Sequence, residues 1–275
     1  MDHSEKTRLA VNEEGCLNSK RPLRFETIFI CWLSVATSFG ATAEPGRIVI
    51  PAKSSLQTVT AGLHKLSGRN GLLYIPTGPV RPLPLLILLH KAGGSASEWF
   101  SGGGSYAPYA DKGGFIILAP QAPGPTWGTG PKNWGYDYLA INRALEEAFA
   151  GCAIDRNRIA IGGFSDGASY ALSLGLANGD VFSYVIAFSP GFIVRAQARG
   201  RIGNNNEIRI PLVYIAHGVG DNVLPIGSTS RIFVSSLRKN GYHVEFDEFS
   251  GGHHLSRQAA DKAMAWLTTA FHQRR

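Results

Sequence analysis

Short apolar runs alternate along the chain with segments of helical composition. The run Pro82-Leu-Pro-Leu-Leu-Ile-Leu-Leu-His90 is apolar between its ends, and such runs are typical of central strands that are covered on both faces. The segment 137–150 instead has the periodicity of an amphipathic helix. Along the chain, this pattern predicts strands at 58–66, 71–76, 82–90, 114–120, 184–188, 211–216 and 243–249, a further strand that follows Arg158, and helices at 95–110, 137–150, 168–177, 228–239 and 255–271.

The alternation of strands and helices defines the expected fold class. It predicts an α/β fold with a mostly parallel central sheet, helices on both faces, and functional residues at the carboxyl ends of the strands. The chain has 275 residues, and 44% of them are hydrophobic, which is ample for one large core. We therefore expect a single domain over 44–275. No period of about 20 to 50 residues recurs, which argues against a repeat architecture.

Residues 1–43 differ in composition from the rest of the chain. A polar stretch is followed by the basic Lys20-Arg-Pro-Leu-Arg24, the apolar 28–36 and the small residues Ala41-Thr-Ala43. This order is typical of a secretory signal, and its apolar core is shorter than the roughly 20 residues of a membrane span. We predict a leader on a secreted or periplasmic protein without a stable membrane span. A disordered leader on a cytoplasmic protein is the alternative.

Charge and cysteine content exclude several function classes. The formal net charge is +7, but the densest basic group has no interleaved aromatic residues, which favours a solvated loop over a nucleic-acid surface. That group consists of Arg195, Arg199, Arg201 and Arg209. Of the three cysteines only Cys152 lies outside the leader, so neither an internal disulfide nor a zinc pattern is expected. His90, His217 and His243 are not spaced as metal ligands, and we interpret them as packing or hydrogen-bonding residues at strand ends.

The segment Gly163-Phe-Ser165-Asp-Gly167 is the strongest functional motif. It follows an apolar run and precedes an alanine- and leucine-rich segment, which is the strand, turn and helix context that a G-x-S-x-G nucleophile elbow requires. A glycine-lined turn without chemistry is the alternative, because a short motif also occurs by chance. Ser165 is therefore the candidate nucleophile.

Two downstream residues supply the partners that a serine nucleophile needs. A serine hydroxyl becomes reactive when a histidine takes its proton and an acidic residue orients that histidine. Asp221 lies just after the strand predicted at 211–216, and His253 follows the last predicted strand. Each alone fits a turn or a surface residue, but the order Ser, Asp, His is that of α/β-hydrolases. We assign Asp221 as the acid and His253 as the base, with His254 as a neighbour.

The reaction intermediate of such an enzyme needs two backbone N–H donors for its oxyanion. Asp166, the residue after the nucleophile, is expected to supply one donor. The loop His90-Lys-Ala-Gly-Gly94 is expected to supply the second through Ala92. An ordinary glycine-rich turn is the alternative. The absence of a following Gly-Lys-Ser/Thr argues against a phosphate-binding loop.

These motifs together resemble the phospholipase/carboxylesterase/thioesterase family of α/β-hydrolases, and they are similar to small esterases of the polyhydroxybutyrate-depolymerase kind. The resemblance covers Leu72 to about Leu267. It implies the α/β-hydrolase fold and the same roles for Ser165, Asp221, His253, Ala92 and Asp166. It rests on the motifs Leu89-His-Lys-Ala-Gly-Gly-Ser95, Gly163-Phe-Ser-Asp-Gly167, His217-Gly-Val-Gly-Asp-Asn-Val-Leu-Pro225 and Gly251-Gly-His253.

Lys91 departs from the family pattern, which usually has glycine there. If the backbone at this position needs a positive φ, the lysine is strained and shifts the oxyanion loop. Alternatively, Lys91 adds a cation near the developing negative charge.

The expected function is hydrolysis of carboxylic esters through an acyl-enzyme, with a small-molecule ester or thioester as substrate and with no metal or organic cofactor. A thioesterase and a lysophospholipase would use the same residues. A non-catalytic binding module on a hydrolase fold is the alternative from another class. Besides Lys91, Trp127 and Trp134, with Phe100 and Phe192, are candidates to line the substrate pocket or, equally, to anchor loops.

Overall fold

The computed structural model describes residues 44–52, 59–79, 81–128, 133–194, 201–202 and 208–273. All of these residues belong to one compact unit. The predicted leader at 1–43 lies outside the described residues, as do Arg195 and Arg199 of the basic loop.

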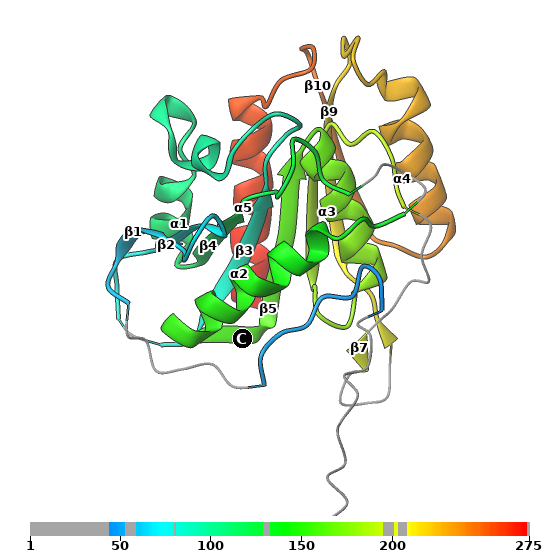
Figure 1. Cartoon of the computed structure of the whole chain (residues 1–275). Helices are drawn as coiled ribbons and strands as arrows, with labels where there is room; N and C mark the ends of the chain where they lie inside the picture. The colour runs from blue at the N-terminus through cyan, green and yellow to red at the C-terminus, as the bar shows by residue number, and fades with distance from the viewer. Residues whose placement is uncertain are drawn as a thin grey trace, which may run out of the picture. The chain divides into compact units, whose positions relative to one another are not determined.

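Eight strands form one sheet in the order β1-β2-β4-β3-β5-β6-β9-β10 (Figure 1). The pairs β1–β2 and β2–β4 are antiparallel, and every pair from β4 onwards is parallel. The mostly parallel sheet that the alternating pattern predicts is thereby confirmed. The strands are β1 (Gly62–Lys65), β2 (Gly71–Ile75), β3 (Leu83–Leu89), β4 (Ile116–Pro120), β5 (Ile154–Phe164), β6 (Tyr184–Phe188), β9 (Leu212–Gly218) and β10 (Val244–Phe249).

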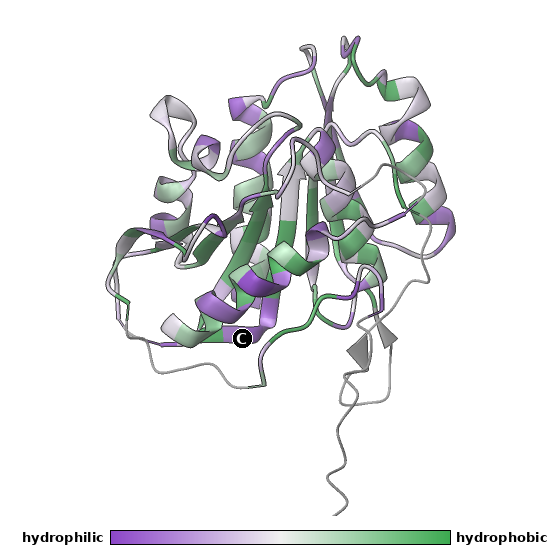
Figure 2. Ribbon diagram, viewed as in Figure 1, coloured by the Kyte–Doolittle hydropathy of each residue, from purple (hydrophilic) through white to green (hydrophobic). Residues whose placement is uncertain are grey.

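Helices cover both faces of the sheet. One hydrophobic layer contains side chains of α2, α3 and α4, and the other contains side chains of α1 and α5. Figure 2 shows that hydrophobic residues concentrate in the strands between these helices, whereas α2 carries both kinds of residue. The helices are α1 (Ala107–Gly113), α2 (Asp137–Gly151), α3 (Asp166–Ala177), α4 (Ser230–Lys239) and α5 (Arg257–Gln273).

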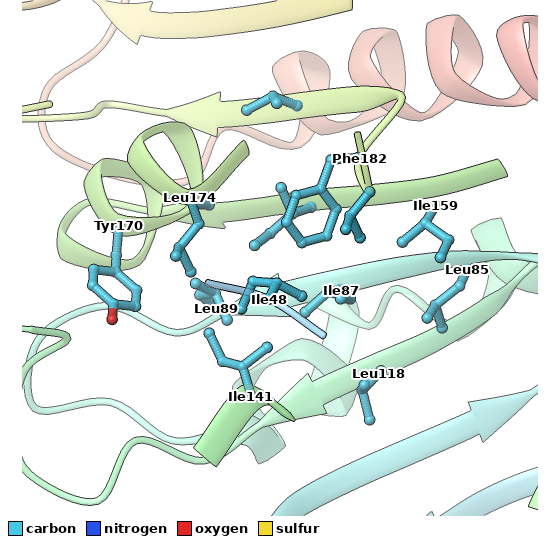
Figure 3. Packing of buried hydrophobic residues seen from close by; sticks show 14 of the residues in the cluster. Ile48, Leu85, Ile87, Leu89, Leu118, Ile141, Ile159, Tyr170, Leu174 and Phe182 are labelled. Carbon is cyan, nitrogen blue, oxygen red and sulfur yellow. The ribbon is translucent and has the colours of Figure 1, made fainter. Parts of the chain in front are cut away.

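The side chains of β3 alternate between the two layers. Leu85, Ile87 and Leu89 enter the layer of α2 and α3 (Figure 3), whereas Leu86 and Leu88 enter the other. Successive side chains of a strand point to opposite faces, so a strand that is apolar throughout must be covered on both sides. All seven residues of β3 are buried, which fixes this strand in the centre of the sheet.

The structure differs from the predicted pattern in the connection after β3. The helix predicted over 95–110 is instead two short 3₁₀ turns, η1 (Ala96–Phe100) and η2 (Gly102–Gly104), followed by α1. Three consecutive glycines interrupt the helix because glycine loses more conformational entropy on ordering than any other residue. The strand predicted at 58–66 is also shorter, and a two-stranded pair, β7 (Arg201–Ile202) with β8 (Ile208–Arg209), forms where a loop was expected.

Within the described ranges, no helix is both long and apolar enough to cross a bilayer.

Candidate active site

Ser165 lies in the sharp turn between β5 and α3. Its φ of 58° and ψ of −117° fall in a region that residues with a side chain rarely adopt and that costs about 1–3 kcal/mol. The turn also brings α3 close to the end of β3. A Cβ on Gly167 would clash with the carbonyl oxygens of Leu89 and His90, so this position requires glycine. The local geometry is that of a nucleophile elbow.

Three loops at the carboxyl ends of parallel strands bring Ser165, His253 and Asp221 together. The Ser165 hydroxyl donates a 2.8 Å hydrogen bond to Nε2 of His253. Nδ1–H of the same ring donates to Oδ2 of Asp221 at 2.6 Å. Asp221 follows β9, and His253 follows β10. The three residues that the sequence singles out therefore form one continuous hydrogen-bonded chain.

Asp221 is 5% exposed, and its oxygens are fully engaged. Oδ1 accepts the backbone N–H groups of Val223 and Leu224 at 2.9 and 2.8 Å, while Oδ2 accepts from His253. Burial acts to raise the pKa of this carboxyl, but the hydrogen bonds from Leu224, His253 and Val223 outweigh it and lower the pKa. Asp221 is thus held as a carboxylate.

The loop after β3 is held by two aromatic residues. Nδ1–H of His90 donates to the Lys91 carbonyl at 2.8 Å, and Nε2 accepts the N–H of Ala122 at 3.1 Å. The indole N–H of Trp127 donates to the His90 carbonyl at 2.8 Å. These contacts fix the start of the loop that contains Ala92.

Ala92 and Asp166 are the predicted oxyanion donors. In the loop after β3, the N–H groups of Gly93 and Gly94 already donate to the carbonyls of Pro125 and Lys91, at 2.6 and 3.0 Å. Gly93 has a φ of 66°, so the left-handed residue of this loop is a glycine. Within the described residues, the N–H groups of Ala92 and of Asp166, the first residue of α3, donate to no protein acceptor. Both remain available to a ligand.

Trp127 and Trp134 are buried rather than exposed to a pocket. Their side chains are 1% and 8% exposed. The backbone N–H of Trp127 donates to Oδ2 of Asp166 at 2.7 Å, and the Trp134 carbonyl accepts the hydroxyl of Tyr170 at 2.9 Å. Both indoles pack against the Tyr170 ring. Of the two sequence interpretations, the loop anchor fits and the pocket wall does not.

The other two aromatic candidates are half-buried elsewhere. Phe100 stacks on Tyr74, with 6.1 Å between ring centroids, and Phe192 packs against the layer that contains α2 and α3.

Lys91 lies at a hollow of about 190 Å³ beside the triad residues. The hollow is lined by Lys91, Glu98, Trp99, Phe164 and Leu255. The Phe164 ring lies against the imidazole of His253, with 5.1 Å between centroids, so the hollow lies close to His253. Nζ of Lys91 is paired with Oε1 of Glu98 at 2.7 Å.

The backbone at Lys91 does not adopt the positive φ that would strain a lysine at this position. Among the described non-glycine residues, only Ser165 and Ser189 have positive φ. Sequence reasoning missed the other lining residues because they come from separate segments. Phe164 alone carried a signal, since it precedes the candidate nucleophile.

In the described part of the chain, no group of three or more His, Cys, Asp or Glu side chains could hold a metal ion. Cys152 is buried.

Comparisons with known proteins identify esterases among the relatives of this chain. The phospholipase/carboxylesterase family matches residues 139–270. Feruloyl esterase C of Emericella nidulans is 26% identical over 216 residues, which cover 76% of each chain. A probable acetylxylan esterase A of Aspergillus fumigatus is 25% identical over 158 residues, which cover 54% of this chain and only 42% of the relative. The acetyl xylan esterase structure from Aspergillus awamori superposes with a TM-score of 0.56 at 16% identity, over 77% of this chain and all of that one.

The fold and the relatives together place the chain in the α/β-hydrolase superfamily. Within that superfamily, the protein is an enzyme that hydrolyses carboxylic esters.

Proposed function

We propose that the protein hydrolyses esters through a triad in which Ser165 is the nucleophile, His253 the general base and Asp221 the residue that orients it. The observation that carries this proposal is the hydrogen-bonded chain from Ser165 to His253 to Asp221, at 2.8 and 2.6 Å. The strained backbone at Ser165 supports it, because such strain is characteristic of functional positions.

In acylation, Nε2 of His253 takes the proton from Ser165 as Oγ attacks the acyl carbon. The carboxylate of Asp221 stabilises the imidazolium that forms. The imidazolium then protonates the departing alkoxide, which leaves as the alcohol. In deacylation, His253 takes a proton from water, the hydroxide adds to the acyl-enzyme, and the proton returns to Ser165 as the acid departs.

The backbone N–H groups of Ala92 and Asp166 are the proposed oxyanion donors. Their lack of an acceptor within the described residues supports this role, since an oxyanion hole must offer donors that no protein group occupies.

The hollow beside His253 suggests a compact acyl or aryl group as its occupant. Its volume is about 190 Å³, below the roughly 300–1,000 Å³ that is typical of ligand pockets. A long fatty-acyl chain would extend beyond it into solvent. The two named relatives act on feruloyl esters and acetylxylan, and we infer that this protein likewise removes a small acyl or aromatic acyl group from a carbohydrate. This inference ranks the thioesterase and lysophospholipase alternatives below the ester hydrolase.

Hydrolysis of p-nitrophenyl esters from acetate to palmitate by the full-length chain tests this proposal. We expect turnover that is highest for short acyl groups and that falls by at least about 10³-fold in Ser165→Ala, because the nucleophile is lost. Ser236→Ala, a change on the exposed side of α4, is the matched control and should retain full activity. Comparable turnover by wild type and Ser165→Ala would rule out the triad.

Covalent labelling by a fluorophosphonate separates an enzyme from a binding module with the same fold. Wild type should be labelled on Ser165, and Ser165→Ala should not be. A wild-type protein that folds but takes up no label would favour the binding module.

We also propose that the protein is exported. The leader pattern at 1–43 supports this location, and amino-terminal sequencing of the protein from its native host tests it. Cleavage after Ala43 is expected, whereas an intact amino terminus on intracellular protein would favour the cytoplasmic alternative.

A further inference from the structure

Two imidazoles share one carboxylate oxygen at the site. Oδ2 of Asp221 accepts from Nδ1–H of His253 at 2.6 Å, and Nε2 of His217 lies 3.0 Å from the same oxygen. His217 is at the end of β9 and is 0% exposed. The sequence interpretation of His217 as a strand-end hydrogen-bonding residue did not connect it to Asp221.

The surroundings of His217 determine which ring nitrogen carries the proton. The Ser230 hydroxyl, at the start of α4, lies 2.7 Å from Nδ1. Both neighbours of Nε2 are acceptors, namely Oδ2 of Asp221 and the Leu224 carbonyl at 2.8 Å. Nε2 must therefore carry a proton, and Nδ1 accepts from Ser230 when the ring is neutral. Burial favours this neutral form, because it lowers the pKa of His217 more than its hydrogen bonds raise it.

His217 also closes a ring of hydrogen bonds around the acid. Leu224 donates its N–H to Oδ1 of Asp221 and accepts from Nε2–H of His217 through its carbonyl. Groups of the segment from His217 to Leu224 thus contact both oxygens of the carboxylate. One further charged residue faces His217 from β10: Glu248 is its partner in the strand register and is itself paired with Arg231 at 2.7 Å.

We propose that His217 is a positioning residue that aims Oδ2 of Asp221 at His253, with Ser230 fixing the ring of His217 in its donating form. This proposal rests on the proposed function of the triad. Because Nε2–H of His217 also donates to Oδ2, the Asp221 carboxylate attracts the imidazolium of His253 less strongly than it would without this second donor.

The test compares His217→Phe, which removes the donor, with His217→Gln, whose amide N–H can replace it. We expect kcat/KM to fall about 10- to 100-fold in His217→Phe, the loss expected for a hydrogen bond to a charged group. His217→Gln should recover at least half of that loss on a logarithmic scale. His243→Gln, at an exposed position before β10, is the matched control and should behave as wild type.

The pH profile of kcat/KM separates positioning from a merely structural role. In His217→Phe, Asp221 loses the donor Nε2–H and attracts the imidazolium of the proposed base more strongly. The acidic limb of the kcat/KM profile should therefore move to higher pH. Ser230→Ala should move this limb in the same direction and lower kcat/KM at least about threefold, because Nδ1 of His217 then loses its hydrogen-bond donor and the ring is held less firmly. This second variant decides the question if His217→Phe does not fold.

The proposed role of His217 would be overturned if the variants fold, keep the wild-type kcat/KM and show the same acidic limb in the pH profile as wild type. Fluorophosphonate labelling of Ser165 in wild type tests the triad itself. If wild type is not labelled, the proposed function fails; if wild type is labelled and the variants match it in rate and profile, only the positioning role fails.

Discussion

Two buried histidines near the site have both ring nitrogens committed to hydrogen bonds. His90 donates from Nδ1 and accepts at Nε2, whereas His217 accepts at Nδ1 and donates from Nε2. Fixed tautomers matter because a proton on the wrong nitrogen would turn a donor toward a donor at His90. At His217 it would leave an acceptor nitrogen facing two acceptor oxygens. At the scale of single residues, the site is therefore defined by neighbours that determine where each proton lies.

Lys91 provides a test at this scale. Its backbone is unstrained and its ammonium is paired with Glu98 in an exposed position, where an ion pair contributes only about 0–1 kcal/mol. We expect Lys91→Gly to keep or raise kcat for a short p-nitrophenyl ester. Glu98→Gln, which breaks the ion pair but keeps the cation, is the comparison. A loss of about tenfold or more in Lys91→Gly alone would make the lysine a participant in the reaction.

At the scale of elements, the elbow depends on how closely α3 approaches β3. The loop that contains Ala92 starts where β3 ends, and Gly167 of α3 packs directly on the last carbonyls of that strand. This backbone contact therefore holds the proposed nucleophile, Ser165, next to the loop that contains Ala92.

Gly167→Ala tests this contact. The added methyl group has to displace the carbonyls of Leu89 and His90, so we expect the free energy of unfolding to fall by about 1–3 kcal/mol, the cost of overpacking. Activity should fall as well, because the oxyanion loop moves. Gly103→Ala, where a Cβ meets no atom within 4 Å, is the control. Urea unfolding of both variants makes the comparison, and equal stabilities would contradict the close approach.

At the scale of the whole molecule, buried histidines couple stability to pH. Burial lowers the pKa of both His90 and His217, so the unfolded chain binds protons below about pH 6.5 that the folded chain resists. Stability contributed by these groups is complete above that pH and is lost as the pH falls toward their folded pKa values.

Urea unfolding at pH 7.5 and pH 5.5 tests this coupling. We expect wild type to lose up to about 1.4 kcal/mol more between these two pH values than His217→Gln, which has no group to titrate there. His243→Gln should follow wild type. The same loss in wild type and His217→Gln would show that His217 does not contribute.

The sequence predicted those parts of the molecule that depend on local pattern and chain order. The apolar run at 82–90 could only be a central strand, and the order of Ser165, Asp221 and His253 identified residues that the fold brings within hydrogen-bond distance. The helix that the spacing predicted over 95–110 is interrupted at Gly102–Gly104, because ordering three glycines in a helix costs more conformational entropy than the surrounding apolar residues offset.

The direction in which a side chain points, and the contacts between residues far apart in the chain, could not be predicted from the sequence. Trp127 is of a residue type that often lines pockets, but its indole points into the core, where its N–H donates to the His90 carbonyl. The hollow beside His253 combines residues from as far apart as Lys91 and Leu255, and no periodicity relates them. His217 and Asp221 are four residues apart, but their contact depends on how tightly the loop between them turns.

The origin of the residues in the hollow has a consequence for protein engineering. Lys91, Glu98 and Trp99 all come from the connection between β3 and α1, whereas Ser165, Asp221 and His253 come from loops after other strands. Three of the five lining side chains can therefore be exchanged by grafting one short segment, without replacing any residue of the proposed proton-transfer chain. A library confined to that connection is a compact way to search for new substrate preferences.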